Sequence, residues 1–507
     1  MLELNTQAAI ITEKMAFTST NRGLRQLNVG ITLMLSASAT AGYNASQINS
    51  LLVLPEFAFF LSGLNASAKG LIIASVSLGS FLTFIPASYI ADRMGRRACV
   101  SIGALLVMIA AIVQTAVTHP WAFFGARVVT GMGVGISQTA APLLIAESAH
   151  PRQRRKLTGL YNAVWFCGSI TAAGIAFSTL SLQNSWSWRI PCLMQILYPT
   201  LQLVAVCVIP ESPRWLVSKG RRGQALAMLT RYHGNGNRED VVVQEQYDQI
   251  CSSISAEEDL KSASQWSAFL RTKGDAHRLA ICILLGFMQE WTGNGIISYY
   301  LAPILSSVGI KDSVHQSAVN LSLQVWNLIF AVGGASTSDR YGRRVLWMSS
   351  TTLMMIFLAT ITLMTGLFAE LHIIEAGIAV VPMLFLFCAS YDFAYMPLFI
   401  AYPAEILPFQ LRAKGLAITL TTDSLACFFN QYVNPVAFSV LHWRYFSLYL
   451  GCLAFFMAVV YFLFPETQDR TLEEVARIFE SKECLSVESA DEEKDFGTVP
   501  YAPKSQF

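Results

Sequence analysis

The stretch Asp92-Arg-Met-Gly-Arg-Arg97 occurs a second time, with one residue changed, as Asp339-Arg-Tyr-Gly-Arg-Arg344. Each copy lies between two apolar runs that are long enough to cross a bilayer. A second pair of motifs also matches, since Pro210-Glu211 follows the sixth apolar run and Pro465-Glu466 follows the twelfth. These repeats indicate a chain built from two related halves.

The composition is that of a protein surrounded by lipid. Of the 507 residues, 53% are hydrophobic and only 13% are charged, whereas soluble domains have about 25% charged residues. The net charge of +2 is too small to suggest a nucleic-acid partner. The ten cysteines form no CxxC motif or Cys/His cluster, so we expect no disulfide framework, metal or other cofactor.

Hydropathy predicts twelve membrane-spanning helices. A helix needs about 20 predominantly apolar residues to cross the hydrocarbon core. The segments that satisfy this lie at 24–44, 68–90, 98–118, 120–147, 157–180, 188–209, 276–300, 315–337, 345–368, 376–402, 412–436 and 444–464. We therefore expect an all-α membrane protein with two six-helix bundles. Its predicted parts are a cytoplasmic tail (1–23), a bundle (24–210), a cytoplasmic loop with short helices (211–275), a second bundle (276–466) and a cytoplasmic tail (467–507).

The distribution of basic residues supports this count. With the N-terminus inside, the loops on the inner side hold most of the Arg and Lys residues, whereas the outer loops hold only Lys69, Arg189, Lys311 and Arg444. Cytoplasmic loops are enriched in positive charge, and a miscounted helix would invert half of the pattern. We expect an integral protein of the plasma membrane with both termini in the cytoplasm.

Several motifs resemble those of the sugar porter family of the major facilitator superfamily. They are Gly42-Tyr43, Arg127 with Gly131, Trp188-Arg-Ile-Pro191, Pro210 to Leu216, both basic loops and Pro465 to Arg470. The resemblance covers about 24–475, and strings such as Trp291 to Gly295 and Phe429 to Pro435 are similar to fungal lactose and hexose permease-like members. The resemblance implies transport by alternating access, with a monosaccharide or disaccharide bound between the two bundles near the bilayer midplane.

The resemblance also implies a cytoplasmic gate made of ion pairs. In the family, these pairs close the inner side of the outward-facing carrier and break when it faces inward. Arginine suits this role because its planar guanidinium pairs with a carboxylate through two hydrogen bonds. Each arginine alone has a simpler interpretation, as a topology signal. The residues expected in the gate are Asp92, Arg93, Arg97, Glu147, Arg154, Glu211, Asp339, Arg340, Arg344, Glu405, Arg412 and Glu466.

A sugar site must replace water with side-chain amides, hydroxyls and aromatic faces. Polar residues inside membrane helices are costly and therefore suggest function, although they also hold helices together. By the family resemblance, the residues expected to line the site are Asn162, Gln289, Glu290, Asn294, Tyr299, Asn327 and Asp423.

The chain departs from the family pattern in ways that bear on the substrate. Glu290 replaces a common Gln, Asp423 replaces an Asn, Asp392 replaces a Glu, and Ile400 replaces the Trp of facilitative glucose carriers. The site therefore loses a stacking face and gains negative charge if these carboxylates face it. A related polyol or an amino sugar stays open as an alternative substrate.

The residue that couples transport to protons in some family members is absent. Those members have Asp after the Gly-Tyr of the first helix, facing the Arg of the fourth, and here the pair is Asn44 and Arg127. Because an amide cannot titrate, we favour a facilitator. The competing hypothesis is proton symport in which Glu290 or Asp423 carries the proton, since desolvation raises the pKa of a carboxyl group.

Two other classes of function remain for comparison. A non-transporting sugar sensor of the same fold usually has a long cytoplasmic tail, whereas the predicted tail here starts only at residue 467. An enzyme is not expected, because no nucleotide-binding loop or nucleophile–base set stands out. Gly131, Gly133 and Gly135 lie inside an apolar helix, where we expect them to allow close helix packing.

Overall fold

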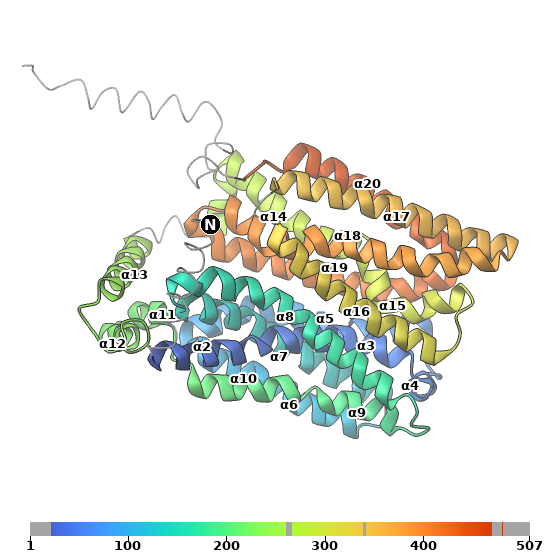
Figure 1. The fold of residues 1–507 in the computed structure, drawn as a ribbon, viewed down its shortest axis with the longest axis horizontal. Coiled ribbons are helices and arrows are strands. Elements are labelled where there is room, and N and C mark those ends of the chain that lie inside the picture. Colours follow the sequence, from blue (N-terminus) through green and yellow to red (C-terminus); the bar gives the residue numbers. More distant parts are fainter. Residues whose placement is uncertain (1–21, 260–265, 338–340, 469–478, 480–507) are drawn as a thin grey trace, which may run out of the picture.

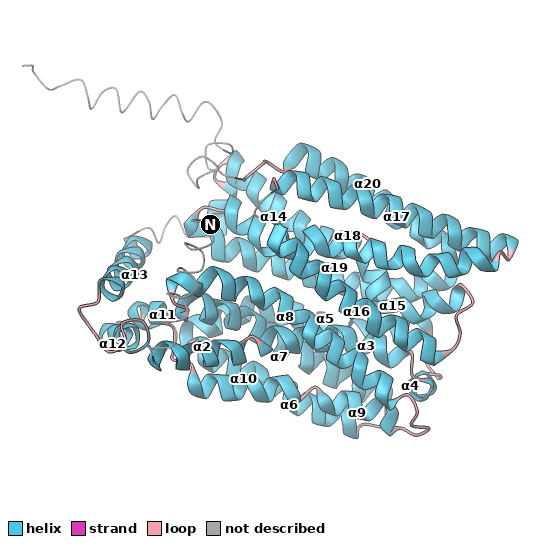
Figure 2. Ribbon diagram, viewed as in Figure 1, coloured by secondary structure: helices cyan, strands magenta, loops and turns pink. Residues whose placement is uncertain are grey.

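The computed structural model describes residues 22–259, 266–337, 341–468 and 479. Within these ranges every regular element is a helix, as Figure 2 shows, which confirms the predicted all-α fold. The two halves of the chain lie side by side, with α11–α13 at one end of the molecule and α4 at the opposite end (Figure 1). We call these the loop end and the α4 end.

The first half contains six crossings. The elements are α2 (Arg22–Met34) continued by α3 (Ser36–Leu52), α4 (Pro55–Phe60), α5 (Ala66–Met94), α6 (Arg96–Ala116), α7 (Pro120–Ser148), α8 (Pro151–Thr179), and α9 (Trp186–Met194) continued by α10 (Leu197–Val208). The loop helices that follow are α11 (Pro213–Ser218), α12 (Arg222–Tyr232), α13 (Val241–Asp259) and η1 (Trp266–Leu270).

The second half repeats the arrangement. Its elements are α14 (Lys273–Trp291) followed by α15 (Asn294–Ser307), α16 (Ser313–Thr337), α17 (Arg343–Leu371), α18 (Ile374–Ile406), α19 (Phe409–Leu441), η2 (His442–Arg444) and α20 (Tyr445–Leu463). Between α14 and α15 the chain turns at Gly293, whose φ of 97° favours glycine. The seventh crossing is therefore a broken helix, and it reaches Ser307 rather than the predicted residue 300.

Three of the crossings are more polar than the others. Eight segments are long and apolar enough to span a bilayer by composition, and they leave out α2–α3, α14–α15 and α16. The polar side chains of α3 and α16 are buried inside the protein, among them Asn44, Gln47, Asn49, Asn320 and Asn327. Because these side chains avoid lipid, they lower the hydropathy without preventing the helix from crossing. The first crossing also extends to Leu52, beyond the predicted residue 44.

The glycines of α7 lie at tight helix contacts. A Cβ atom at Gly131 would overlap the carbonyl oxygen of Val76 on α5. A Cβ atom at Gly133 would lie 2.6 Å from the carbonyl oxygen of Gly103 on α6. A Cβ at Gly135 would lie 2.5 Å from Thr83 Oγ1. The prediction that these glycines allow close packing is confirmed.

The two bundles are joined near the α4 end. α5 packs along α19 and α8 packs along α16. Ser67 Oγ lies 2.8 Å from the Tyr432 hydroxyl, and Ser77 Oγ donates to Gln431 Oε1 at 3.1 Å. Every hydrogen bond between described residues of different bundles lies in this half of the molecule. The carrier is therefore held together across the bundles at its α4 end.

Candidate functional site

A group of acidic side chains lies among the helices of the second bundle. Glu290 lies in the last turn of α14, and Asp423 lies on the neighbouring α19, close enough for the two carboxylates to interact electrostatically. Tyr391 of α18 is within electrostatic range of both and of Asp392. Cys427 of α19 lies beside the Glu290 carboxylate. The structure thus brings the predicted residues Glu290 and Asp423 together, and it adds Tyr391, which sequence reasoning missed.

Two of these carboxylates have oxygens without a protein partner. Glu290 Oε2 and Asp423 Oδ1 are shielded from solvent and accept no hydrogen bond from the described residues. The Gln289 side-chain oxygen is in the same situation. Buried acceptors are usually satisfied, so an unsatisfied set in one place marks a site where a ligand or proton is useful.

Gln289 and Asn327 both face α18. Gln289 Nε2 lies 3.9 Å from Met396 Sδ, and the Asn327 amide, with its nitrogen toward α18, donates to Asp392 Oδ2 at 3.2 Å. Asp392 and Met396 are one helical turn apart, so both amides contact the same face of α18. Asn327 is 8% exposed, and its amide also donates to the Leu323 carbonyl at 3.1 Å. These bonds suit a helix-packing role at Asn327, whereas Gln289 keeps a free acceptor.

Asn294 connects the broken helix to the same group. It begins α15 directly after Gly293, its oxygen accepts from Ser298 Oγ at 3.3 Å, and its side chain lies beside Tyr391. The Tyr391 hydroxyl also donates to the Gln289 carbonyl at 3.0 Å. Tyr391 therefore fixes the end of α14 and the start of α15 relative to α18.

The two other residues expected in the sugar site, Asn162 and Tyr299, have no described contact with this group. Asn162 is half-buried on α8 of the other bundle, and no hydrogen bond between described residues joins its side chain to the acidic group. The side chain of Tyr299 lies outside the described part.

A network that sequence reasoning did not assign joins α19 to α20 and α14. The Tyr445 hydroxyl of α20 donates to Asn434 at 2.8 Å, and Asn430 donates to the Glu290 carbonyl of α14 at 2.6 Å. The sequence signal that could have indicated this network is the pair Asn430 and Asn434, which lie four residues apart in one helix.

Asn44 and Arg127 are both buried but do not contact each other. Asn44 Nδ2 donates to the Thr40 carbonyl of its own helix at 2.8 Å. Arg127, only 1% exposed, donates to Gln47 Oε1 at 3.3 Å and to Ser75 Oγ at 3.2 Å. Within the described part of the chain no carboxylate forms an ion pair with Arg127. Its partners are therefore neutral, and Gln47 takes the place expected for Asn44.

The motifs at the loop end repeat in three dimensions. Glu211 accepts hydrogen bonds from the backbone N–H groups of Arg96 at 3.1 Å and Arg97 at 3.2 Å, which begin α6. Glu466 accepts from the same groups of Arg343 at 2.8 Å and Arg344 at 3.1 Å, which begin α17. A carboxylate at a helix N-terminus satisfies unpaired N–H groups and the helix dipole.

The ion pairs at this end differ from those expected. Arg96 pairs with Glu147 at 3.4 Å and Arg343 pairs with Glu405 at 3.0 Å, each within one bundle. Arg97 and Arg344 instead donate to the backbone carbonyls of Val206 and Tyr461. Asp339 and Arg340 lie outside the described residues.

Four further gate residues are placed without a cross-bundle bond. Arg154 is within electrostatic reach of Glu147, and Arg93 and Asp92 are exposed. Arg412 donates to the Leu407 carbonyl at 3.5 Å. None of the ion pairs between described residues at the loop end joins the two bundles.

Comparison with known proteins identifies the family. The sequence pattern of the family described as "Sugar (and other) transporter" matches residues 30–479. The chain belongs to this family. It is 29% identical to hexose transporter 2 of Kluyveromyces lactis over 421 residues, which is 81% of this chain and 74% of that protein. It is 27% identical to the MFS-type transporter oryC of Aspergillus oryzae, over 82% of this chain and 78% of that protein.

Solved structures agree on the fold. The inward-open conformation of the xylose transporter XylE from E. coli superposes with a TM-score of 0.72, at 21% identity, over 89% of this chain and 99% of that one. The proton:xylose symporter XylE bound to 6-bromo-6-deoxy-D-glucose gives 0.73, at 22% identity, over 90% and 100%. The twelve-helix major facilitator fold is therefore confirmed. The chain is a sugar transporter of the major facilitator superfamily, an integral membrane protein and not an enzyme.

Proposed function

We propose that the chain carries a neutral monosaccharide or disaccharide by alternating access and as a facilitator, without proton coupling. The observation that carries this proposal is the setting of Arg127, whose hydrogen-bond partners are the neutral Gln47 and Ser75. Asn44 occupies the position of the proton-binding acid of symporters. Amides and hydroxyls do not titrate at physiological pH, so this charge has no proton-dependent partner.

The sugar would bind against the second bundle. Gln289, Glu290 and Asp423 each offer an acceptor without a protein partner, and sugar hydroxyls donate to such acceptors. Asn294 and Tyr391 add further polar groups beside them. We propose that Asn162 and Tyr299 complete the site from the facing helices and that Asn327 supports it by holding Asp392 in place.

Uptake of labelled glucose by a transport-null cell tests the proposal, with mono- and disaccharides, a polyol and an amino sugar as competitors. We expect saturable uptake that a protonophore leaves unchanged and that Gln289→Ala reduces. Collapse of accumulation by the protonophore would overturn facilitation. Normal surface expression without uptake of any labelled sugar would favour a non-transporting sensor instead.

Proton symport is the second candidate, and one observation favours it. Glu290 and Asp423 lie close together from two helices, and each keeps an unsatisfied oxygen. Two neighbouring carboxylates shielded from water readily share a proton, because both cannot ionise at low cost. The same pair would attract a cationic amino sugar. Glu290→Gln separates these alternatives, since it would remove proton dependence in the first case and amino-sugar preference in the second.

We further propose that the loop end faces the cytoplasm of a plasma-membrane carrier, with both termini inside. The basic residues of α6, α12 and α17 gather at this end, as the positive-inside rule requires. An epitope fused to the C-terminus should be reached by antibody only after the cells are permeabilised. Staining of intact cells would contradict this orientation.

A further inference from the structure

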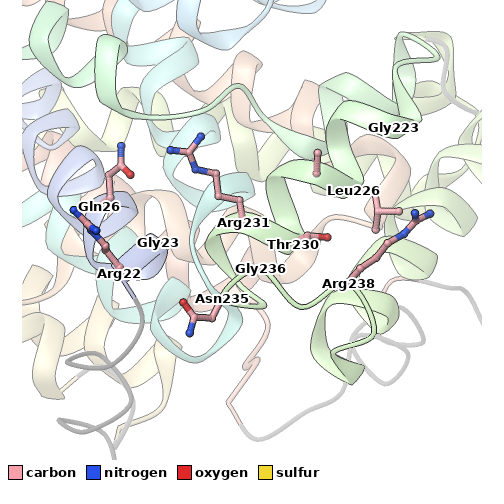
Figure 3. A pocket seen from close by; sticks show the side chains of 11 residues that line it. Arg22, Gly23, Gln26, Gly223, Leu226, Thr230, Arg231, Asn235, Gly236 and Arg238 are labelled. Carbon is pink, nitrogen blue, oxygen red and sulfur yellow. The ribbon is translucent and has the colours of Figure 1, made fainter.

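A cleft opens between the first crossing and the loop helices. It has a volume of about 810 Å³ and lies between the start of α2 and the helix α12 with the turn that follows it. Its polar lining consists of Arg22, Gln26, Thr230, Arg231, Asn235 and Arg238. In Figure 3 the Arg231 side chain extends from α12 toward the side where Arg22 and Gln26 stand, and Arg238 lies beyond Thr230.

The cleft is positively charged. Three guanidinium groups line it, and no Asp or Glu side chain is among the described residues that line it. In the part of the chain that the structure describes, none of Arg22, Arg231 and Arg238 forms an ion pair. The Arg231 guanidinium lies over the Tyr232 ring, 5.3 Å from its centroid. Stacking of this kind orients a guanidinium while its in-plane N–H groups stay available.

The neutral lining groups are also suited to an oxyanion. The Gln26 and Asn235 amides and the Thr230 hydroxyl can each donate a hydrogen bond. Asn235 and Gly236 have positive φ angles of 49° and 88°, which turn the chain sharply at the cleft edge. Small-ligand sites have volumes of about 300–1,000 Å³, so the cleft holds more than a single phosphate.

We propose that this cleft binds a phosphate-bearing anion of the size of a phosphorylated inositol or sugar. Arginine forks match phosphate oxygens in pairs, and three of them lining one cleft favour such a group over a carboxylate. Two sources share this chemistry. α2 begins the first membrane crossing, so an anionic lipid headgroup of the inner leaflet can reach the cleft. A free phosphate ester from the cytoplasm can reach it as well.

Binding here would tie two parts of the carrier together. Arg22 and Gln26 belong to the first crossing, whereas Thr230 and Arg231 belong to a loop helix that packs against it. A ligand that contacts both stabilises this packing, because it binds the folded arrangement and not the separated parts. The sugar site takes no part in this inference, which rests only on the proposed cytoplasmic orientation of the loop end.

The test uses the full-length purified protein in phosphatidylcholine nanodiscs. Thermal unfolding is followed with inositol trisphosphate or inorganic phosphate added to the buffer, or with a phosphatidylinositol bisphosphate built into the disc. The test variant carries both Arg22→Gln and Arg231→Gln. The control variant is Arg222→Gln, which changes an exposed arginine on α12 outside the cleft lining. The control removes an arginine from the same helix as Arg231 but from outside the cleft lining.

We expect a rise in the unfolding temperature that the control retains and that needs about tenfold more ligand in the double variant. Stabilisation by the soluble probes would identify a free phosphate ester, and stabilisation by the lipid alone would identify a headgroup. Either result supports the site. An unchanged unfolding temperature with every probe, or equal stabilisation of the double variant, would overturn it.

Discussion

Asn320 of α16 is hydrogen bonded to Asn49 of α3 across the boundary between the two bundles. Asn49 Nδ2 lies 3.0 Å from Asn320 Oδ1, and Asn320 Nδ2 lies 3.0 Å from Ser50 Oγ. All three side chains belong to the bundle ends near α4, and both asparagines are buried. Opening the carrier at this end must break these bonds, so neutral amides hold one of its two conformations.

Asn320→Ala should shift the carrier toward the conformation that is open at the α4 end. Each lost hydrogen bond contributes about 0.5–1.5 kcal/mol, so we expect a population shift of about tenfold. Spin labels at Ser62 and Ser439, after replacement of the exposed Cys167 and Cys207, report the distance between the bundles. Ser322→Ala is the control, because Ser322 bonds only to carbonyls of its own helix. An unchanged distance distribution would remove the role given to Asn320.

Gly70→Val should prevent closure at the α4 end. A Cβ atom at Gly70 would lie 2.5 Å from the Tyr432 carbonyl oxygen and 3.1 Å from Pro435 Cγ, both on α19 of the other bundle. Backbone cannot give way as a flexible side chain can, so α5 and α19 must separate. We expect near-complete loss of transport with normal surface expression. Gly125→Val is the control, since a Cβ there meets nothing within 4 Å, and wild-type uptake by Gly70→Val would refute the close contact.

Glu405→Gln should favour the conformation open at the loop end and slow exchange. Glu405 is paired with Arg343 inside its own bundle here, and the family resemblance implies that it joins the cross-bundle belt in the alternate conformation. A partly exposed pair is worth about 0–1 kcal/mol, so the expected change in exchange rate is severalfold. Arg412→Gln should act in the same direction. Equilibrium exchange rates at matched surface expression measure both, and unchanged rates would exclude a gating role.

Low pH should loosen the loop helices through His233. Its ring contacts the Ser148 carbonyl at 3.1 Å and Gln246 at 2.7 Å, which joins α12 and α13 to the end of α7. Burial lowers the pKa of His233 below its usual value, with hydrogen bonds to Gln246 and Ser148 opposing this. As the pH falls, His233 is therefore protonated at a higher pH when α12 has separated from α7 than when the two are packed together. The stabilising effect is complete above about pH 6.5 and is lost as the pH falls below it.

Thermal unfolding between neutral and mildly acidic pH checks this expectation. The wild-type protein should lose stability on acidification, whereas His233→Gln should start lower and depend less on pH. His315→Gln is the control, because His315 is exposed and contacts Asp312, which directly precedes its own helix α16. Equal pH dependence of His233→Gln and the wild type would contradict the role of His233.

The sequence predicted the fold because its signals are local. Apolar length, basic loops and the two repeats suffice to count twelve crossings, even where polar residues such as Gln47 and Asn320 lower the hydropathy of a helix. Which arginine of a basic loop makes an ion pair depends on helical phase. Neighbours in the sequence point in different directions, so Arg96 and Arg343 pair with carboxylates while Arg97 and Arg344 bind carbonyls.

The site was predicted less completely for the same reason. Gln47 lies one turn from Asn44, and only the relative placement of α3 and α7 shows that Arg127 contacts Gln47. Tyr391 sits in an apolar helix among other aromatic residues, where nothing in the sequence distinguishes it from a packing residue. Its contacts with Gln289 and Asn294 become visible only when α14, α15 and α18 are assembled.

Counterflow in proteoliposomes tests the central claim most directly. Purified protein is reconstituted, the vesicles are loaded with unlabelled glucose, and labelled glucose is added outside at equal pH and with a protonophore present. A facilitator working by alternating access should accumulate the label transiently above its equilibrium level, and Gln289→Ala should reduce that peak. Entry of label that never exceeds equilibrium, or no entry while the protein is folded, would contradict the account.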